Sequence, residues 1–182
     1  AEVIEQMAEA RNWGIETGKP VLSLEKMADR KNHVIRRLRS GIESLLTSAQ
    51  VDVYRGMGTV RPDKTVLISG ISGVSGTEEQ TVQAESVIVA TGSVPAVPPV
   101  PGLETVAYHT SDTIFDLADI PESLVIIGGG VIGVEFAYIF RNFGSKVTIL
   151  EMADRLLPTE DPDAAAALTR ALRNKGVSVV TG

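Results

Sequence analysis

The sequence contains no cysteine among its 182 residues, so the chain itself can form no disulfide, offer no thiolate and build no cysteine metal site. Histidine is nearly as scarce, because His33 and His109 are the only two and stand far apart in the sequence. A metal site built on this pair is not expected. With neither a thiol nor a pair of neighbouring histidines, we predict no metal ligand and no catalytic residue within this stretch of sequence.

Long apolar runs are also missing. No segment approaches the roughly 20 apolar residues that a membrane-spanning helix needs, and residues 1–20 lack the pattern of a secretory signal peptide. We therefore expect no membrane association and a cytoplasmic protein. The formal net charge of −6 disfavours a nucleic-acid partner, although a local basic patch stays possible. The remaining composition, 43% hydrophobic and 22% charged, is ordinary for a globular protein.

One stretch, residues 123–151, is the most informative part of the sequence. It reads SLVIIGGGVIGVEFAYIFRNFGSKVTILE. An apolar run enters a glycine cluster, an apolar-periodic segment continues to Phe143, and a second strand-like run ends at Glu151. This is Gly-x-Gly-x-x-Gly between a strand and a helix, with an acid at the end of the next strand, and it predicts dinucleotide binding. The alternative is a glycine-rich turn that only packs a helix on a sheet.

In a dinucleotide site, each glycine of the motif is required for a physical reason. Gly128 lets the chain turn sharply off the strand, Gly130 lets the backbone approach a pyrophosphate, and Gly133 lets the helix lie close to the sheet. The helix start directs free N–H groups and its positive dipole end at the phosphates. The residues predicted to bind the pyrophosphate are Gly128, Gly129, Gly130, Val131, Ile132 and Gly133.

Glu151 stands 18 residues after Gly133, close to the roughly 20 expected for the acid that binds the adenosine ribose. A carboxylate there accepts hydrogen bonds from the two ribose hydroxyls and repels a 2′-phosphate, which favours NAD over NADP. No arginine follows directly, since Arg155 is four residues further on. The alternative is a solvated acid at the end of a strand.

Two helices are predicted ahead of this stretch, over residues 1–12 and over residues 23–48. The first has apolar residues at near-helical spacing and is ended by Trp13 and Gly14. In the second, Ser23 is a suitable N-cap and an apolar stripe recurs with the helical period. Its arginines and lysines form either a binding patch or, as we favour, a solvated helix face.

The middle of the chain is predicted to be β-rich. Residues 51–60 are expected to form a strand, and Asp63 with Lys64 is expected to form a turn. Short antiparallel strands are expected on either side of a flexible, glycine- and serine-rich loop at 69–80. Residues 86–91 form a continuous apolar run, as in a strand buried on both faces. Small residues follow it, and the carboxyl end of such a strand is where α/β sheets hold ligands. They are Thr91, Gly92 and Ser93.

The connections are marked by proline. Residues 94–102 hold four of the nine prolines and are predicted to be a stiff, extended crossover at a boundary. A short helix is expected to start at Ser111 or Asp112 and to run through Leu117. Beyond residue 151, Asp161 followed by proline predicts the start of a helix that ends near Lys175, and a third strand is expected to begin at residue 177.

Taken in order, these segments resemble the dihydrolipoyl dehydrogenases of the pyridine nucleotide-disulfide oxidoreductase family. The matching segments are GIE…P…KMADRKNHVIRRLRSGIESLL, VDVYRGMGTV, VIVATGSVPAVPPVPG, TSDTIFDL and VIIGGGVIGVEFAYIFRNFGSKVTILEMADRLLP. The ATGS segment ahead of GGGVIGVE is specific to the broad family. The long second helix and EMADRLLP favour the lipoamide enzyme over glutathione or mercuric reductases.

The resemblance implies an α/β fold with Rossmann-like FAD- and NAD(P)-binding domains, incomplete at both ends. Residues 1–120 would be part of the FAD domain and residues 121–182 the N-terminal half of the NAD domain. Electrons would pass from dihydrolipoamide through a redox-active disulfide and FAD to NAD⁺. By position, Gly58 and residues 91–93 would contact FAD, and Glu135 matches the family's glutamate near the nicotinamide. From the sequence alone, Glu135 is a first-turn charge that complements the helix dipole.

Several family features have no counterpart in this sequence. An FAD-binding Gly-x-Gly-x-x-Gly, the Cys-x4-Cys redox pair and the C-terminal domain with its His-Glu pair are missing, and His109 does not match that histidine. We therefore expect an internal fragment of such an enzyme, homodimeric when complete, acting on a lipoyl-carrying protein of a 2-oxo acid dehydrogenase or glycine cleavage complex. The alternatives are a non-catalytic nucleotide-binding module and a relative such as mercuric or glutathione reductase.

Overall fold

The computed structural model describes residues 1–70 and 79–182, so the predicted flexibility of the loop at 69–80 falls mostly outside the described residues. The described chain forms two compact units. One comprises residues 1–29 and 97–182, and the other comprises residues 30–96. Each unit holds its own three-stranded sheet, and the α/β class is confirmed. The predicted division at residue 121 concerns which cofactor each part binds and stays a prediction.

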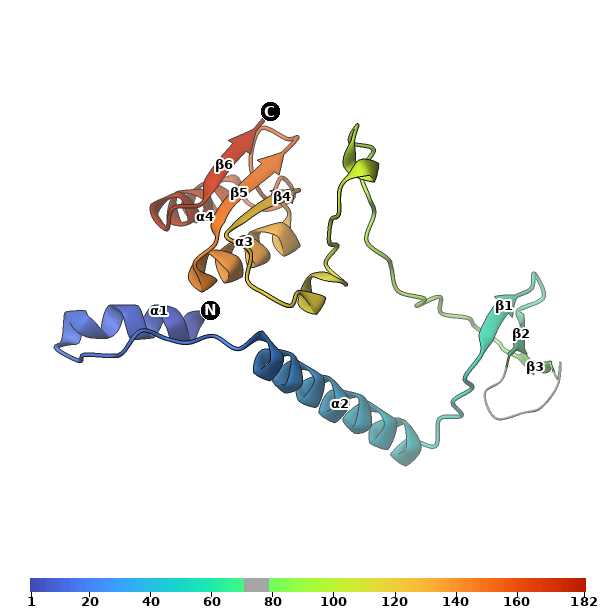
Figure 1. Ribbon diagram of the computed structural model, residues 1–182. Coiled ribbons are helices and arrows are strands. Elements are labelled where there is room, and N and C mark those ends of the chain that lie inside the picture. Colours follow the sequence, from blue (N-terminus) through green and yellow to red (C-terminus); the bar gives the residue numbers. More distant parts are fainter. Residues whose placement is uncertain (71–78) are drawn as a thin grey trace. The chain divides into compact units, whose positions relative to one another are not determined.

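The first unit contains the predicted β-α-β-α-β succession (Figure 1). Its elements are β4 (Ser123–Ile127), α3 (Val131–Phe143), β5 (Lys146–Glu151), α4 (Pro162–Asn174) and β6 (Ser178–Thr181). The strands are parallel in the order β4-β5-β6, with Ile126 opposite Ile149 and Ile149 opposite Val179. Strands joined in sequence order by helices form the half-fold that the glycine motif predicted.

Local sequence signals account for the ends of these helices. Gly144 ends α3 at a φ of 104°, a left-handed conformation that favours glycine. Asp161 begins α4, and its side chain accepts hydrogen bonds from the N–H groups of Asp163 and Ala164, both at 3.0 Å. The cap at residue 161 predicted from the sequence is therefore confirmed.

The core of this unit lies between one face of the sheet and the two helices. Val147 and Ile149 are two residues apart on β5, so they share a face, and they are 2% and 0% exposed. Buried residues from both helices and from the loop after β5 pack in the same cluster. They are Val134, Ala137 and Phe140 of α3, Ala165 and Leu172 of α4, and Leu156 and Leu157.

The opposite face of the parallel sheet is apolar and open. Val125 and Ile127 of β4, Leu150 of β5 and Val180 of β6 alternate with buried or partly buried positions and are all exposed. Parallel sheets are normally covered on both faces, which is why their strands consist of continuous apolar runs. The apolar sequence of these strands therefore suits a sheet that is covered on both faces, whereas the described residues cover only one face of this sheet.

The helix α1 (Glu2–Glu9) packs on α3 through a charged cluster. Glu5 accepts a hydrogen bond from the Tyr138 hydroxyl and pairs with the ammonium of Lys175, whose Nζ lies 5.6 Å from the Tyr138 ring centroid. The bond to Glu5, with burial and nearby glutamates adding to it, raises the pKa of Tyr138 to about 12. Beyond α1, a 3₁₀ turn (Ala10–Trp13) ends at Gly14, as predicted.

The second unit contains an antiparallel sheet of β1 (Met57–Val60), β2 (Thr65–Ser69) and β3 (Gln80–Gln83) in the order β1-β2-β3. Lys64 makes the turn between β1 and β2 at a φ of 64°, and the Asp63 side chain accepts from the Thr65 N–H at 3.1 Å. The antiparallel strands and this turn are as predicted. Of the strand predicted over residues 51–60, only residues 57–60 are confirmed, since residues 51–56 pair with no strand among the described residues.

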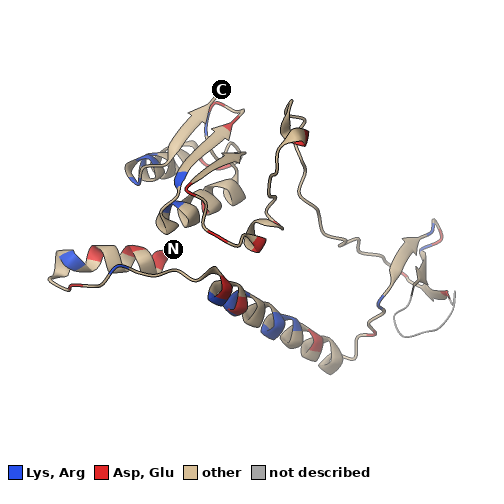
Figure 2. Cartoon of the chain, viewed as in Figure 1, with Lys and Arg blue, Asp and Glu red and all other residues tan. Residues whose placement is uncertain are grey.

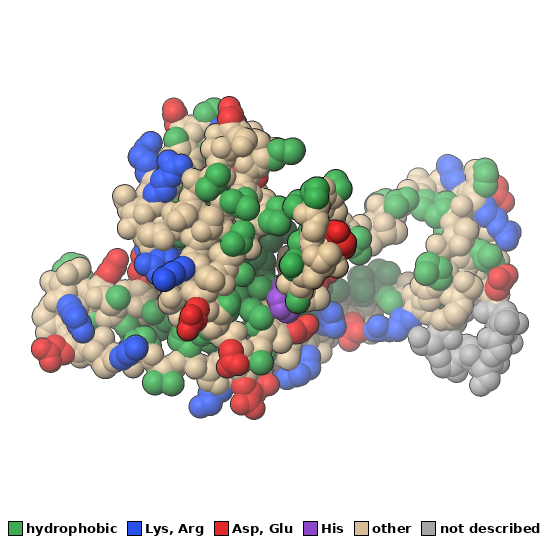
Figure 3. Space-filling view, turned by 45° about the horizontal axis from the view of Figure 1, so that its top comes forward, with side chains coloured by type: hydrophobic (Ala, Val, Ile, Leu, Met, Phe, Trp, Pro, Cys, Tyr) green, Lys and Arg blue, Asp and Glu red, His purple; other side chains and the backbone are tan. Residues whose placement is uncertain are grey.

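The long helix α2 (Leu24–Ser48) has the predicted bounds and begins where Ser23 Oγ accepts from the Lys26 N–H at 3.3 Å. All 25 of its residues are described, and none is buried. Acidic residues stand toward both ends of α2, and its Lys and Arg lie between them (Figure 2). Its apolar stripe is exposed too, with Leu38 at 63% and Leu45 at 71%. Hydrophobic side chains are visible at many places on the molecular surface in Figure 3.

The run at residues 86–91 is not the buried strand that the sequence predicted. It has no regular secondary structure, and Ile88 and Val89 are 90% and 73% exposed. A buried strand needs hydrogen-bonding neighbours, and both described sheets are built from other segments.

The proline-rich crossover at 94–102 is irregular as predicted. The helix expected at 111–117 is a single 3₁₀ turn, η3 (Ile114–Asp116), which follows the turn η2 (Leu103–Thr105).

Candidate nucleotide-binding site

The glycine loop leaves β4 through a turn that requires glycine. Gly128 has a φ of 111°, a conformation that L side chains rarely adopt, and its N–H still donates to the carbonyl of Leu150 at 2.8 Å. The chain therefore keeps its ladder bond to β5 while it turns toward α3. This is the sharp turn predicted for the first glycine of the motif.

Gly133 provides the close approach between helix and loop. A Cβ at this position would lie 2.1 Å from the carbonyl oxygen of Gly128 and 3.3 Å from the Ile126 side chain. The first of these contacts is with backbone, which cannot rotate away as a side chain can. Only glycine fits, as the motif predicted for its third position.

The start of α3 presents unsatisfied N–H groups. The first intrahelical bond is donated by Val134 to the carbonyl of Gly130 at 3.0 Å, so the N–H groups of Val131, Ile132 and Gly133 precede it. No side chain caps this helix start, and a Cβ at Gly130 would meet no atom within 4 Å. An open, uncapped helix start beside a glycine loop fits a pyrophosphate.

Glu151 ends β5 beside this loop. Its Oε2 accepts from the N–H of Gly129 at 2.6 Å and its Oε1 from the N–H of Ala153 at 2.7 Å. These backbone hydrogen bonds, that from Ala153 first, hold the pKa of the Glu151 carboxyl below its ordinary value, so it stays charged. Each oxygen has a second lone pair for a ribose hydroxyl. The structure thus brings the acid and the glycine loop together, and the bond to Gly129 adds a role that the sequence did not reveal.

The loop after β5 completes the surroundings of Gly129. A Cβ on Gly129 would lie 2.4 Å from Cδ2 of Leu156, and the N–H of Leu157 donates to the carbonyl of Gly129 at 2.9 Å. Sequence reasoning found neither leucine, because two apolar residues before a proline carry no sign of a contact made 27 or 28 residues away along the chain.

Arg155 is held by its own loop. Its guanidinium donates to the carbonyl of Pro158 at 2.7 Å and to that of Glu160 at 3.2 Å. Glu135 is exposed and is the fifth residue of α3, so the predicted first-turn position is wrong, because the first turn of α3 holds no acid. Its predicted position near a nicotinamide stays a prediction.

The residues predicted to contact FAD lie in the second unit. Gly58 pairs with Ile68 in the antiparallel sheet, where an added Cβ would make only an ordinary contact of 3.7 Å with Val66. Residues 91–93 are exposed, and Gly92 has a φ of 75°. The described residues do not bring Gly58 and residues 91–93 into one site, and their FAD role stays a prediction.

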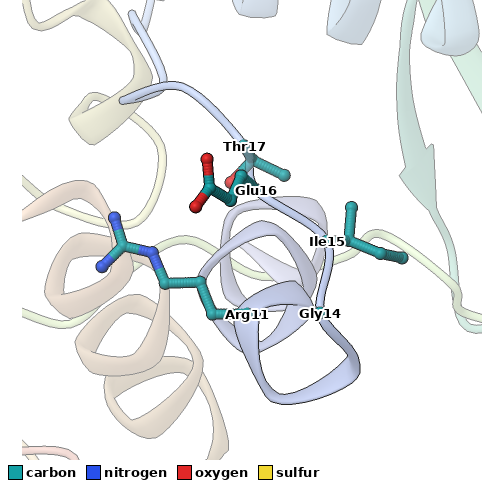
Figure 4. Close-up of a pocket in the computed structure, with 5 residues that line it drawn as sticks. All are labelled: Arg11, Gly14, Ile15, Glu16 and Thr17. Carbon is teal, nitrogen blue, oxygen red and sulfur yellow. The ribbon is translucent and has the colours of Figure 1, made fainter.

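A separate surface pocket lies where α1 and its 3₁₀ turn end. It is lined by Arg11, Gly14, Ile15, Glu16 and Thr17 (Figure 4). The pocket shares no residue with the glycine loop, and the hydroxyl of Thr17 is bound to the carbonyl of Met7 at 3.0 Å. Among residues 1–70 and 79–182, no cluster of three metal-ligating side chains is found, nor any helix with the length and hydropathy to cross a membrane.

Known proteins match most or all of this sequence. A family model described as pyridine nucleotide-disulphide oxidoreductase matches residues 2–182. A dihydrolipoyl dehydrogenase of Acholeplasma laidlawii is 37% identical over 187 residues, and a mercuric reductase of Staphylococcus aureus is 30% identical over 170 residues. The solved HOCl-induced flavoprotein disulfide reductase RclA of Escherichia coli is 36% identical, with a TM-score of 0.68.

These matches cover this chain almost completely but only part of each relative. They span 100%, 93% and 84% of the chain for the dehydrogenase, the mercuric reductase and RclA, respectively. The same matches span 53% of the dehydrogenase, 29% of the mercuric reductase and 34% of RclA. The relatives therefore extend well beyond the region that this chain matches.

Proposed function

The chain belongs to the pyridine nucleotide-disulphide oxidoreductase family, and from that membership we propose that it is the cofactor-binding part of an NAD-dependent dihydrolipoyl dehydrogenase. The single observation that carries the proposal is the glycine loop with its acid. Gly133 fits only without a Cβ, the start of α3 is uncapped, and Glu151 is held charged beside Gly129. Together these features support a dinucleotide at this loop.

In the proposed reaction, dihydrolipoamide loses two electrons and two protons, and NAD⁺ gains a hydride while one proton is released. FAD, when bound, would carry the electron pair between the two substrates. The residues of this chain bind and orient the nucleotide. The N–H groups of Val131, Ile132 and Gly133 would hold the pyrophosphate, and Glu151 the adenosine ribose.

The preference for NAD over NADP follows from charge. The carboxylate of Glu151 stays ionised and would repel a 2′-phosphate. The nearest following arginine, Arg155, donates to two carbonyls of its own loop, so receiving a 2′-phosphate would cost both bonds. Both observations support NAD.

The proposal that part of this chain binds FAD rests on its membership of the family. We assign residues 1–120 to the FAD-binding domain, with Gly58, Thr91, Gly92 and Ser93 at the flavin nucleotide, and residues 121–182 to the NAD-binding domain. The exposed apolar run at 86–91 supports this assignment, because such a run suits a strand of a larger sheet. Glu135 would face the nicotinamide end.

The proposed partner is dihydrolipoamide on a lipoyl-carrying protein of a 2-oxo acid dehydrogenase or glycine cleavage complex. We further propose a cytoplasmic homodimer for the complete protein. The identity to a dihydrolipoyl dehydrogenase over the whole chain supports the substrate. A mercuric reductase matches at lower identity, and reduction of Hg²⁺ is the second candidate.

The test is a paired assay on the complete gene product. After purification, its visible spectrum reports bound flavin, and the rise in NADH absorbance reports dihydrolipoamide-dependent reduction of NAD⁺. We expect a flavin spectrum and turnover with NAD⁺ at least about tenfold faster than with NADP⁺, the ratio that a discrimination of about 1.4 kcal/mol gives. Hg²⁺-dependent oxidation of NADPH without lipoamide activity would favour the second candidate. A flavin-free protein that binds nucleotide would indicate a binding module.

A further inference from the structure

We propose that Leu156 and Leu157 are positioning residues that hold the glycine loop in the form that binds the dinucleotide, an inference that rests on the proposed function. Neither side chain belongs to the motif. Both lie in the loop after β5, 1% and 8% exposed, and both contact or bond to the middle glycine of the loop.

Gly129 is fixed on three sides. Its N–H is bound by Glu151 Oε2 at 2.6 Å, and its carbonyl accepts from Leu157 N–H at 2.9 Å. Its Cα faces the Leu156 side chain so closely that an added Cβ would lie 2.4 Å from Cδ2. Of these partners, Glu151 is part of the predicted site, whereas the two leucines have no predicted contact with the nucleotide.

The hydrogen bond from Leu157 sets the direction of the next peptide group. In a trans peptide the carbonyl of one residue and the N–H of the following residue point in opposite directions. Because the Gly129 carbonyl points at Leu157, the N–H of Gly130 points away from that loop. The rotation of this peptide group therefore decides whether the loop presents a donor or a carbonyl oxygen to an anion.

The backbone conformation of Leu157 suits its role as the hydrogen-bond donor to the carbonyl of Gly129. Its φ is 50°, a left-handed value that is uncommon for a branched apolar residue. Such a conformation persists where the surroundings fix it. Here the side chain is buried in the core, and the Leu157 carbonyl accepts from the N–H of Glu160 at 3.0 Å.

The rest of the loop anchors the two leucines. Arg155 donates to the carbonyls of Pro158 and Glu160, which closes the turn that follows Leu157. On the other side, the carbonyl of Ala153 accepts from the N–H of Gly182 at 3.0 Å, which ties the loop to the end of β6. The loop is thus a fixed support against which the flexible glycines rest, and it reduces the number of conformations that binding must order.

The proposal predicts a specific effect of Leu156→Ala in the complete gene product. Removing this side chain leaves the Cα of Gly129 unsupported, so only a minor fraction of the molecules holds the loop in the form that binds NAD⁺. The Kd for NAD⁺ then rises by the inverse of that fraction. We expect about a tenfold rise in this Kd, measured by calorimetry. Leu156→Met, which keeps the volume, should stay within about twofold of the wild type, because such swaps are well tolerated.

Leu172→Ala is the matched control. Leu172 lies on α4, is 3% exposed and belongs to the same core, so both variants lose a buried leucine. We expect both to lower the thermal midpoint but only Leu156→Ala to raise the Kd for NAD⁺. Equal rises in both variants would mean that Leu156 acts through general stability and would overturn the proposal.

Amide hydrogen exchange gives a readout without nucleotide. Peptides that cover residues 128–134 should exchange faster in Leu156→Ala than in Leu172→Ala, and equal rates would contradict the proposal. This measurement also separates the two claims. A wild-type protein that does not bind NAD⁺ would refute the proposed function, whereas the exchange comparison would still decide whether Leu156 fixes the loop.

A suppressor pair tests the contact directly. Gly129→Ala should weaken NAD⁺ binding because its methyl group would lie 2.4 Å from Leu156 Cδ2, closer than the 3.0 Å and 3.1 Å to Glu151 Cβ and Oε2. Adding Leu156→Ala removes the closest of these contacts, so the double variant should bind NAD⁺ more tightly than Gly129→Ala alone. A double variant no better than the single one would refute the contact.

Discussion

Replacing Glu151 by glutamine separates the charge of this residue from its size. The carboxylate offers two oxygens, and each accepts a backbone N–H, from Gly129 at 2.6 Å and from Ala153 at 2.7 Å. A glutamine amide has a single oxygen, so its NH₂ group must face the other N–H as donor against donor. One charge-assisted bond is weakened and the other is lost.

The expected magnitude follows from these bonds. A hydrogen bond to a charged group contributes about 1.5–3 kcal/mol, so we expect Glu151→Gln to lose about 2 kcal/mol of stability at neutral pH. Because the bond from Gly129 orients the glycine loop and is either weakened or lost, the Kd for NAD⁺ should rise about tenfold. The preference for NAD⁺ over NADP⁺ should shrink as well, since the repulsion of a 2′-phosphate disappears.

The pH dependence of stability tests whether the charged form of Glu151 is the stabilising one. The backbone bonds lower the pKa of Glu151 in the folded protein, so its stabilisation is complete above the ordinary carboxyl pKa of about 4.3 and is lost as pH falls through the lowered value. The thermal midpoints of wild type and Glu151→Gln should differ most near neutral pH and converge in acid. Unchanged stability and unchanged NAD⁺ affinity at neutral pH would refute the role assigned to this carboxylate.

Four further predictions concern other parts of the fold. Gly133→Ala should lower stability by about 1–3 kcal/mol in thermal unfolding, because its Cβ would lie 2.1 Å from the Gly128 carbonyl oxygen and the backbone must shift. Asp161→Ala should cost about 1 kcal/mol in urea unfolding, whereas Asp161→Asn should keep most of the cap. Glu5→Gln should lower the pKa of Tyr138 from about 12 toward 10.0 in a phenolate absorbance titration, with Tyr138→Phe as the blank. The 182-residue chain expressed alone should elute as oligomers in size-exclusion chromatography because its sheet face is exposed, and a monodisperse monomer would contradict this.

The parallel half-fold could be predicted because its signals are local. The turn at Gly128, the cap at Asp161 and the end of α3 at Gly144 each depend on a few neighbouring residues. The same holds for the turn at Lys64 and for the cap of α2 by Ser23. Where a short stretch decides the conformation, the sequence was sufficient.

The errors fall where structure depends on distant partners. Residues 86–91 have the composition of a buried strand, but a strand forms only against a neighbour, and no described segment pairs with them. The contacts of Leu156 and Leu157 with Gly129 were missed for the related reason that packing across a loop has no periodic signature. The position of Glu151 could be predicted from the motif spacing, but its bond to Gly129 could not, because that bond requires the register of β4 against β5.

The central claim is that the loop from Gly128 to Gly133, with Glu151 beside it, binds the dinucleotide. A crystal structure of the complete gene product with NADH tests this most directly. We predict the pyrophosphate within hydrogen-bonding distance of the N–H groups at the start of α3, and the adenosine ribose hydroxyls on the carboxylate of Glu151. A nucleotide bound elsewhere, with this loop contacting no phosphate, would contradict the account.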